Sequence, residues 1–146
     1  MLDIDFFNKK VLDFGTGTGV LAILAQKMGA YNVLAIDYDE NCITNAQENI
    51  NLNSVLNISL KKNNSLSDET GCYDIILSNI TRNIILLNLP DIARLLIENG
   101  TFVASGFYVD ELSFLKEKAI LPVQSFWRFF QWLSCCLFYR CLRYSS

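Results

Sequence analysis

Residues 11–19 read "VLDFGTGTG", which places an acid and three glycines in seven positions after a short apolar run. Residues 9–14 are typical of a buried strand, and the glycines Gly15, Gly17 and Gly19 are typical of a tight turn leading into a helix. Glycine lets a backbone approach a ligand closely, so the turn raises two questions. Which ligand needs that approach, and why does Asp13 stand two residues before the first glycine?

The composition limits the classes of protein that need to be considered. The chain has 146 residues, is 51% apolar and carries a formal charge of −3, which fits one folded domain. The sequence contains no histidine, which excludes Ser-His-Asp and Cys-His catalysis, histidine zinc sites and histidine general bases. Three arginines and no acid follow residue 118, so residues 1–118 carry −6 and show no basic footprint for nucleic acid.

The cysteines and the apolar end of the chain favour a cytoplasmic protein without a membrane span. The five cysteines form no C-x-x-C pair and are odd in number, which is typical of reduced thiols, and the amino terminus shows no secretory pattern. The aromatic run at residues 126–139 is interrupted by Arg128 and Gln131 and is too short to cross a bilayer.

Strand patterns and helix patterns alternate along the chain. We predict strands at 9–14, 32–37, 56–62, 72–79 and 101–107, and helices at 20–28, 40–52, 81–100 and 110–119. The third helix is expected to break near Pro90 and to end at Gly100. The connections are too long for hairpins, so the sequence predicts an α/β fold: a Rossmann-like, open, mostly parallel sheet with helices on both faces.

The spacing of the glycines and the two acids favours one ligand over another. A nicotinamide fingerprint reads G-x-G-x-x-G, whereas this turn reads G-x-G-x-G behind Asp13, which would repel a pyrophosphate but suits a positive amine. Asp37 ends the second strand, 22 residues after Gly15, where it can accept hydrogen bonds from ribose hydroxyls. These features predict S-adenosylmethionine. Asp39 is interpreted as a helix cap in preference to a ligand contact.

At this point the residues resemble a known family. The segments "VLDFGTGTGVLAILAQKMGA", "AIDYDENCITNAQENINLN" and "YDIILSNI" resemble the class I S-adenosylmethionine-dependent methyltransferases. Within that class they are most similar to the bacterial methyltransferases of large-subunit ribosomal protein eleven. Two features distinguish this group from the rest of the class. Asn79-Ile80 stands where other members carry an Asn-Pro-Pro-Tyr type motif, and the segment "RLLIENGTFVASG" follows it.

The resemblance implies a protein methyltransferase that uses S-adenosylmethionine to methylate amino groups, mainly of lysine, on a ribosomal protein. It implies that Asn79 lies at the mouth of the pocket, near the incoming amine, which makes it the candidate catalytic residue. No metal and no general base are predicted. The candidate cofactor-binding residues are Asp13, Gly15, Thr16, Gly17, Gly19, Asp37 and Asn79.

The resemblance covers residues 2–118, so we expect a cofactor-binding core at 1–119 and a separate tail at 120–146. Family members carry an amino-terminal, substrate-recognising domain that does not precede the first strand here, so recognition of the substrate and cofactor affinity are expected to be weakened. The tail is either the last strands of the sheet, with 131–139 as one strand, or unrelated sequence. Its abrupt, acid-free and aromatic composition favours unrelated sequence, which would promote self-association.

Several functions stay open on the sequence alone. The chain is a methyltransferase of a ribosomal protein, a methyltransferase of a small molecule or another protein, or an inactive cofactor-binding fragment. A nicotinamide oxidoreductase is disfavoured by the glycine spacing, and binding of nucleic acid is disfavoured by the acidic charge of residues 1–118.

Overall fold

The computed structural model describes residues 4–106, 125–132 and 136–143. The chain forms two compact units, residues 1–64 and residues 65–146. The predicted helix at 110–119 lies outside the described residues.

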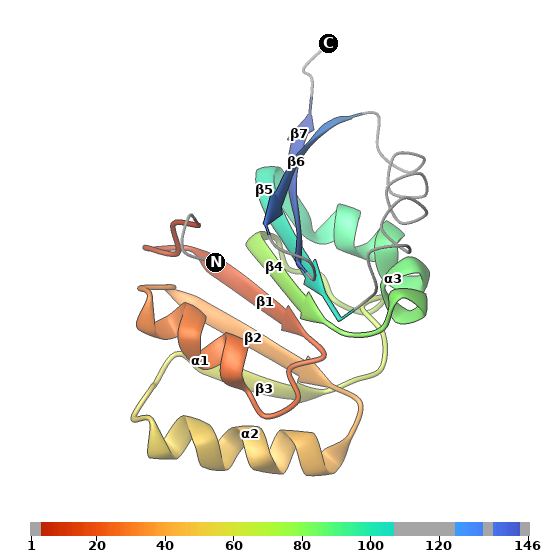
Figure 1. The fold of residues 1–146 in the computed structure, drawn as a ribbon. Coiled ribbons are helices and arrows are strands. Elements are labelled where there is room, and N and C mark those ends of the chain that lie inside the picture. Colours follow the sequence, from red (N-terminus) through yellow and green to blue (C-terminus); the bar gives the residue numbers. More distant parts are fainter. Residues whose placement is uncertain (1–3, 107–124, 133–135, 144–146) are drawn as a thin grey trace. The chain divides into compact units, whose positions relative to one another are not determined.

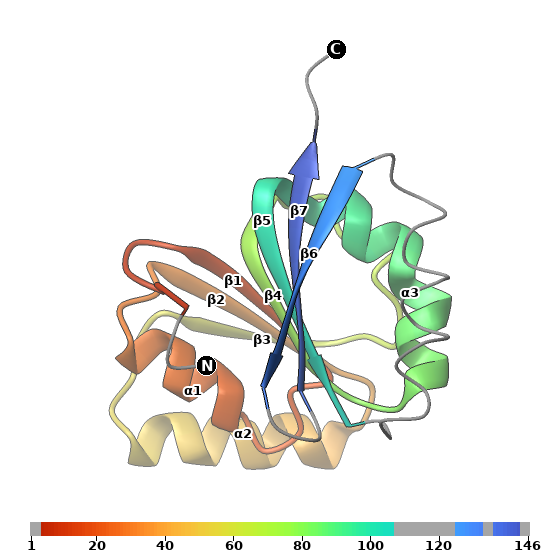
Figure 2. The same ribbon diagram turned by 45° about the horizontal axis from the view of Figure 1, so that its top comes forward.

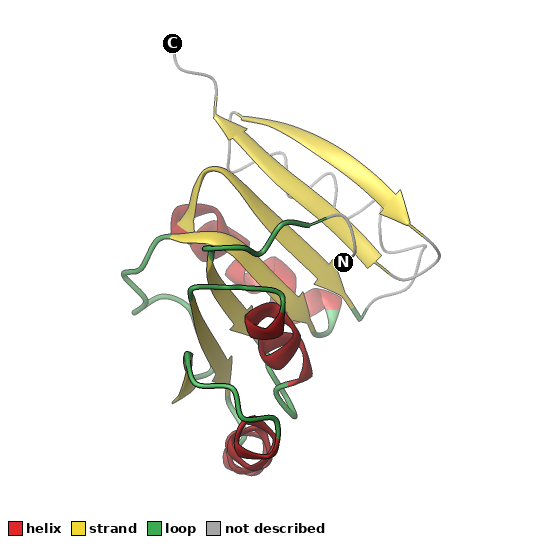
Figure 3. Ribbon diagram, turned by 90° about the vertical axis from the view of Figure 1, so that its left-hand side faces the viewer, coloured by secondary structure: helices red, strands yellow, loops and turns green. Residues whose placement is uncertain are grey.

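The first unit holds three parallel strands and two helices. In chain order these are β1 (Lys10–Phe14), α1 (Val20–Lys27), β2 (Asn32–Asp37), α2 (Glu40–Leu52) and β3 (Ile58–Lys62). The strands pair in the order β3-β2-β1. Because both crossovers run in the same direction, α1 and α2 cover the same face of the three strands, as Figures 1 and 3 show.

Local sequence explains the ends of both helices. Helix α1 stops where Gly29 takes a φ of +98°, and the amides of Gly29 and Ala30 donate to the carbonyls of Gln26 and Ala25, which is a Schellman ending. Helix α2 begins at Asp39, whose carboxylate accepts a hydrogen bond of 2.9 Å from the amide of Asn41. The prediction that Asp39 caps this helix is confirmed.

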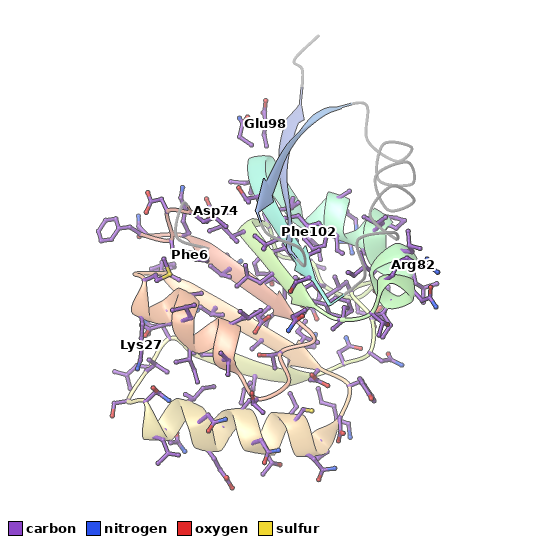
Figure 4. The ribbon with its side chains drawn as sticks, viewed as in Figure 1. Phe6, Lys27, Asp74, Arg82, Glu98 and Phe102 are labelled. Carbon is purple, nitrogen blue, oxygen red and sulfur yellow. The ribbon has the colours of Figure 1, made fainter. Side chains whose placement is uncertain are left out.

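The core of the first unit is formed by the strands and the covered faces of the helices. The labelled side chain of Phe6 in Figure 4 precedes β1 and is 1% exposed, while Val11, Leu12 and Ile36 are fully buried. A second cluster joins the helices to the loop after α2 and contains Ile23, Ile50 and Val55. Strands β1 and β2 are therefore held by apolar packing, and their carboxyl ends are fixed.

The second unit contains β4 (Tyr73–Asn79), α3 (Arg82–Leu95), β5 (Leu96–Ser105), β6 (Ser125–Trp132) and β7 (Cys136–Arg143). Strands β4 and β5 are parallel, β7 is antiparallel to β5, and β6 is antiparallel to β7. Figure 2 shows this part of the sheet with α3 beside it. Phe102 on β5, labelled in Figure 4, is 1% exposed and belongs to the core.

The third helix differs from the sequence-based prediction in two respects. It is continuous through Pro90. It also ends at Leu95 and not at Gly100, because the extended backbone of Leu96 pairs with Tyr73 at the start of β4. Asn99 takes a φ of +62° in the irregular segment after Leu96, and regular pairing with β4 resumes at Thr101.

The tail forms backbone pairs in the structure. The segment 131–139, expected as one strand if the tail completes the sheet, instead falls across the end of β6 at Trp132 and the start of β7 at Cys136. The two strands pair with each other from Ser125↔Arg143 to Trp132↔Cys136.

Candidate functional site

The glycine turn closes the carboxyl end of β1 against β2. Its three glycines, Gly15, Gly17 and Gly19, have φ values of +78°, +55° and +81°. Residues that carry a Cβ rarely adopt such backbone angles. The amides of Gly15 and Thr16 both donate to the carbonyl of Ile36, each at 2.9 Å. The amide of Gly19 donates to the carbonyl of Thr16 at 2.9 Å, which closes the turn before α1.

Asp37 is joined directly to this turn. The amide of Gly17 donates to Asp37 Oδ2 at 2.8 Å, and the amide of Asp39 donates to Asp37 Oδ1 at 3.1 Å. The residue is 6% exposed. A carboxylate has about four lone-pair sites, so acceptor capacity remains on both oxygens for further donors.

Asp13 is fully buried beneath the same turn. Its Oδ2 accepts hydrogen bonds from Thr16 Oγ1 at 2.7 Å and from the amide of Ala22 at 3.1 Å. Its Oδ1 has no hydrogen-bond partner among the described residues. Burial raises the pKa of Asp13 from 3.8 to about 6; the two hydrogen bonds lower it, and the nearby charge of Asp37 raises it further. The charged form of the Asp13 carboxyl is therefore destabilised, and one of its oxygens has no hydrogen-bond partner among the described residues.

The glycines at the tip and at the end of the turn have different surroundings. A Cβ on Gly17 would meet no atom within 4 Å, whereas a Cβ on Gly19 would lie 3.2 Å from Ala46 Cβ on α2. Helix α2 also holds the turn through Asn49, whose Nδ2 donates to the carbonyl of Thr18 at 2.9 Å. Gly17 thus borders open space, and Gly19 allows the turn to pack on α2.

Asn79 belongs to the second unit, where it ends β4 with an exposed side chain. Ser105 Oγ donates to Asn79 Oδ1 at 2.9 Å. The six other predicted site residues all lie in the first unit, where the turn, Asp13 and Asp37 form one hydrogen-bonded assembly. The expectation that Asn79 faces the same pocket stays a prediction.

Three features of the site were not identified from the sequence. Tyr38 stands between Asp37, which ends β2, and Asp39, and it is 67% exposed. Its position next to the acid predicted to bind the ribose was the available signal. Ser105 entered the sequence analysis only as part of the segment "RLLIENGTFVASG", because its contact with Asn79 joins positions 26 residues apart. The bond from Asn49 to Thr18 had no signal in the sequence.

Two kinds of feature are absent from the described part of the chain. No group of three or more histidine, cysteine, aspartate or glutamate side chains there could hold a metal ion. Each helix within the described ranges is too short or too polar to span a bilayer.

Comparison with known proteins assigns the family. A family model described as "Ribosomal protein L11 methyltransferase (PrmA)" matches residues 4–137. The chain belongs to the PrmA family. The resemblance expected from the glycine turn and from Asn79-Ile80 is therefore confirmed.

Individual PrmA relatives agree with this assignment. The ribosomal protein L11 methyltransferase of Phocaeicola vulgatus is 41% identical over 120 residues, which cover 82% of this chain and 43% of the relative. That of Porphyromonas gingivalis is 42% identical over 120 residues, covering 82% of this chain and 41% of the relative. The chain thus spans about two fifths of the length of these curated relatives.

A solved structure confirms the fold class. The ribosomal protein L11 methylase of Lactobacillus delbrueckii subsp. bulgaricus superposes with a TM-score of 0.83 at 31% identity, over 92% of this chain and 71% of that one. The predicted Rossmann-like, open and mostly parallel sheet is confirmed by this PrmA structure. The family is one of methyltransferases, which implies a methyl-donor cofactor.

Proposed function

We propose that this chain is the cofactor-binding and catalytic part of a methyltransferase that transfers a methyl group from S-adenosylmethionine to amino groups of ribosomal protein L11. Membership of the PrmA family supports the reaction class. The names of the relatives support the substrate. The observation that carries the proposal is the 2.8 Å hydrogen bond from Gly17 to Asp37, which makes one assembly of the two predicted ligand-binding elements.

The residues of the first unit fit S-adenosylmethionine in three ways. Asp37 keeps acceptor capacity on both oxygens, as two ribose hydroxyls would require. A Cβ on Gly17 would enter open space, which is the space that a ligand close to the backbone would fill. Asp13 Oδ1 is buried without a partner, and an ammonium donor near it would offset the unfavourable charge.

Each residue then has a distinct role in binding. Asp37 would accept from the ribose hydroxyls, and the backbone of Gly15 and Gly17 would lie against the ligand. Thr16 holds Asp13 through its 2.7 Å hydrogen bond and so acts on the carboxylate. The exposed ring of Tyr38, next to Asp37, would lie against the adenine base.

Methyl transfer requires the protein mainly to position the methyl donor and the acceptor amine. S-adenosylmethionine, when bound, supplies a methyl group on a sulfonium that is already activated for displacement. Holding the reacting groups in line can lower the barrier by about 7–11 kcal/mol. Asn79 would hold the incoming amine, and a lysine amine must lose its proton before it attacks. The chain contains no histidine, so a carboxylate, a tyrosine or water would take this proton.

Two alternatives predict different outcomes. A methyltransferase of a small molecule or of another protein would bind the cofactor and leave L11 unmethylated. An inactive fragment would transfer no methyl group. We place the protein in the cytoplasm, where ribosomal proteins are made, and propose no direct binding of nucleic acid, since residues 1–118 are acidic.

Calorimetric titration of the purified chain with S-adenosylhomocysteine, with NADH as a control, tests the cofactor. We expect binding of the first ligand alone. Incubation with methyl-labelled S-adenosylmethionine and purified L11 then tests the substrate, and labelled L11 is the expected product. Absence of binding to either ligand would refute the proposed cofactor, and cofactor binding without labelled L11 would favour one of the two alternatives.

A further inference from the structure

The ends of β4 and β5 form a small polar arrangement around Asn79. The two strands are parallel, and Asn79 and Ser105 are directly paired in their register. The hydroxyl of Ser105 donates to Asn79 Oδ1 at 2.9 Å. Since the pair is exposed and competes with water, the bond contributes little to folding stability, and its main effect is on the orientation of the Asn79 amide.

Gly106, the residue that follows β5, completes this arrangement. Gly106 has a φ of +91°, and a Cβ on it would lie 3.0 Å from Asn79 Oδ1. The same Cβ would lie 2.9 Å and 3.1 Å from the carbonyl and amide of Ile80. The Ser-Gly pair therefore packs against the Asn-Ile pair with no room for a side chain at the second position.

We propose that Ser105 is a positioning residue that fixes which end of the Asn79 amide is presented to the acceptor amine. The inference rests on the proposed function, because it assumes that Asn79 holds that amine. An asparagine amide has an accepting oxygen and a donating nitrogen, and rotation by 180° exchanges them. Ser105 donates to the oxygen at 2.9 Å, and this bond restrains the amide from rotating out of the orientation that the structure shows.

The orientation decides whether the amine can react. An amide oxygen has two lone pairs, so Oδ1 can accept from Ser105 and from an N–H of the amine, which leaves the amine lone pair free to attack. A rotated amide would place N–H groups there, which would donate to that lone pair and block it. Ser105 would therefore act on the rate of methyl transfer and leave cofactor binding unchanged.

The first test is structural and does not depend on activity. In ¹⁵N-labelled chain, the side-chain amide of Asn79 gives a resonance pair whose order parameter and shift report its orientation. Ser105→Ala should lower the order parameter and shift the pair, whereas Ser105→Thr, which keeps the hydroxyl, should retain both. Thr101→Val removes a hydroxyl from the middle of β5, four residues before Ser105, and serves as the control. An unchanged resonance in Ser105→Ala would overturn the proposal.

The second test uses methyl transfer to L11. Ser105→Ala should lower kcat by about five- to tenfold, the factor that corresponds to one neutral hydrogen bond, while Kd for S-adenosylhomocysteine stays within about twofold. Ser105→Thr should restore most of the rate, and Thr101→Val should keep it. An unchanged kcat, or an equal loss of cofactor affinity, would refute the positioning role. If the unmodified chain labels no L11, the proposed substrate fails, and the resonance of Asn79 still decides whether Ser105 orients it.

Discussion

Gly17 donates its backbone amide to Asp37 Oδ2 at 2.8 Å, so the tip of the glycine turn is tied to the residue that ends β2. The acid at the end of the second strand therefore has two tasks in the proposed function. It holds the turn in shape, and it offers its remaining lone pairs to a ligand. Substitutions at Asp37 must be judged by both stability and affinity.

Asp37→Ala is expected to weaken binding of S-adenosylhomocysteine by about 1.5–3 kcal/mol, the usual scale for hydrogen bonds to a charged group. The free energy of unfolding should fall by about 1–3 kcal/mol, because two backbone amides lose their acceptor. Calorimetric titration and urea unfolding measure the two effects. Asp37→Asn keeps one oxygen, so its affinity and its free energy of unfolding should lie between those of the parent chain and of Asp37→Ala. Undiminished affinity in the alanine variant would remove the ribose assignment.

Gly17 and Gly19 should respond differently to alanine. In Gly17→Ala the new methyl group enters open space, so stability should fall by only about 1 kcal/mol from the positive φ, while ligand affinity should fall at least tenfold. In Gly19→Ala the methyl group meets Ala46 at 3.2 Å, so the loss of stability should be larger.

Thermal unfolding with and without S-adenosylhomocysteine separates the two glycine variants. Gly17→Ala should unfold near the temperature of the parent chain and gain little from the ligand. Gly17→Val should abolish binding, since its larger side chain fills more of the same space. If Gly17→Val binds the ligand as the parent does, the turn is structural and its open side is not the binding surface.

Stability should depend on pH through Asp13. Burial raises the pKa of this carboxyl to about 6, whereas in the unfolded chain it titrates near 3.8. Between about pH 4 and pH 6 the unfolded chain releases a proton that the folded protein keeps. The free energy of unfolding should therefore fall as the pH rises through this window, by on the order of 3 kcal/mol, and level off above pH 6.

Asp13→Asn isolates this effect because it keeps the shape and removes the charge. Relative to the parent chain, it should gain stability between pH 4 and pH 7.5, as measured by urea unfolding at both values. Its affinity for S-adenosylhomocysteine should fall, because the ammonium loses the proposed partner at Oδ1. The opposite pattern, with stability lost at pH 7.5 and affinity kept, would assign Asp13 to the structure of the turn alone.

The parts of the fold that depend on local signals were predictable from the sequence. The glycines from Gly15 to Gly19, the cap at Asp39 and the strand at 32–37 are each specified by neighbouring residues, and the structure has them as expected. The end of α3 was not predictable in this way, because Leu96 leaves the helix to pair with Tyr73, a choice that depends on another strand.

The site shows the same division. The spacing of Asp13, the glycines and Asp37 gave the candidate residues, but it could not show that Asp13 is completely buried with one oxygen unpaired. The contact of Ser105 with Asn79 joins two strand ends and becomes visible only through their register. Long-range pairing carries this information, and periodicity within a segment does not.

Arg94 of α3 holds the segment before β4 and provides a test of stability in the second unit. Its guanidinium donates to the carbonyls of Glu69 at 2.7 Å and of Leu66 at 3.0 Å, and it pairs with Asp91 at 2.9 Å. Arg94→Ala would remove a charged donor from both carbonyls, and the carbonyl of the fully buried Leu66 would keep its weaker partner, the amide of Glu69 at 3.1 Å. We expect the free energy of unfolding to fall by about 2–3 kcal/mol.

Asp91→Ala is the matched control for Arg94, because it removes the ion pair and keeps the bonds to the carbonyls. The pair is spaced i,i+3 on a helix surface, so its loss should change stability by only about 0.2–0.5 kcal/mol. Urea unfolding gives both values, and hydrogen exchange should show faster opening around residues 66–69 in Arg94→Ala alone. Equal losses in the two variants would mean that the ion pair, and not the carbonyl bonds, accounts for the role of Arg94.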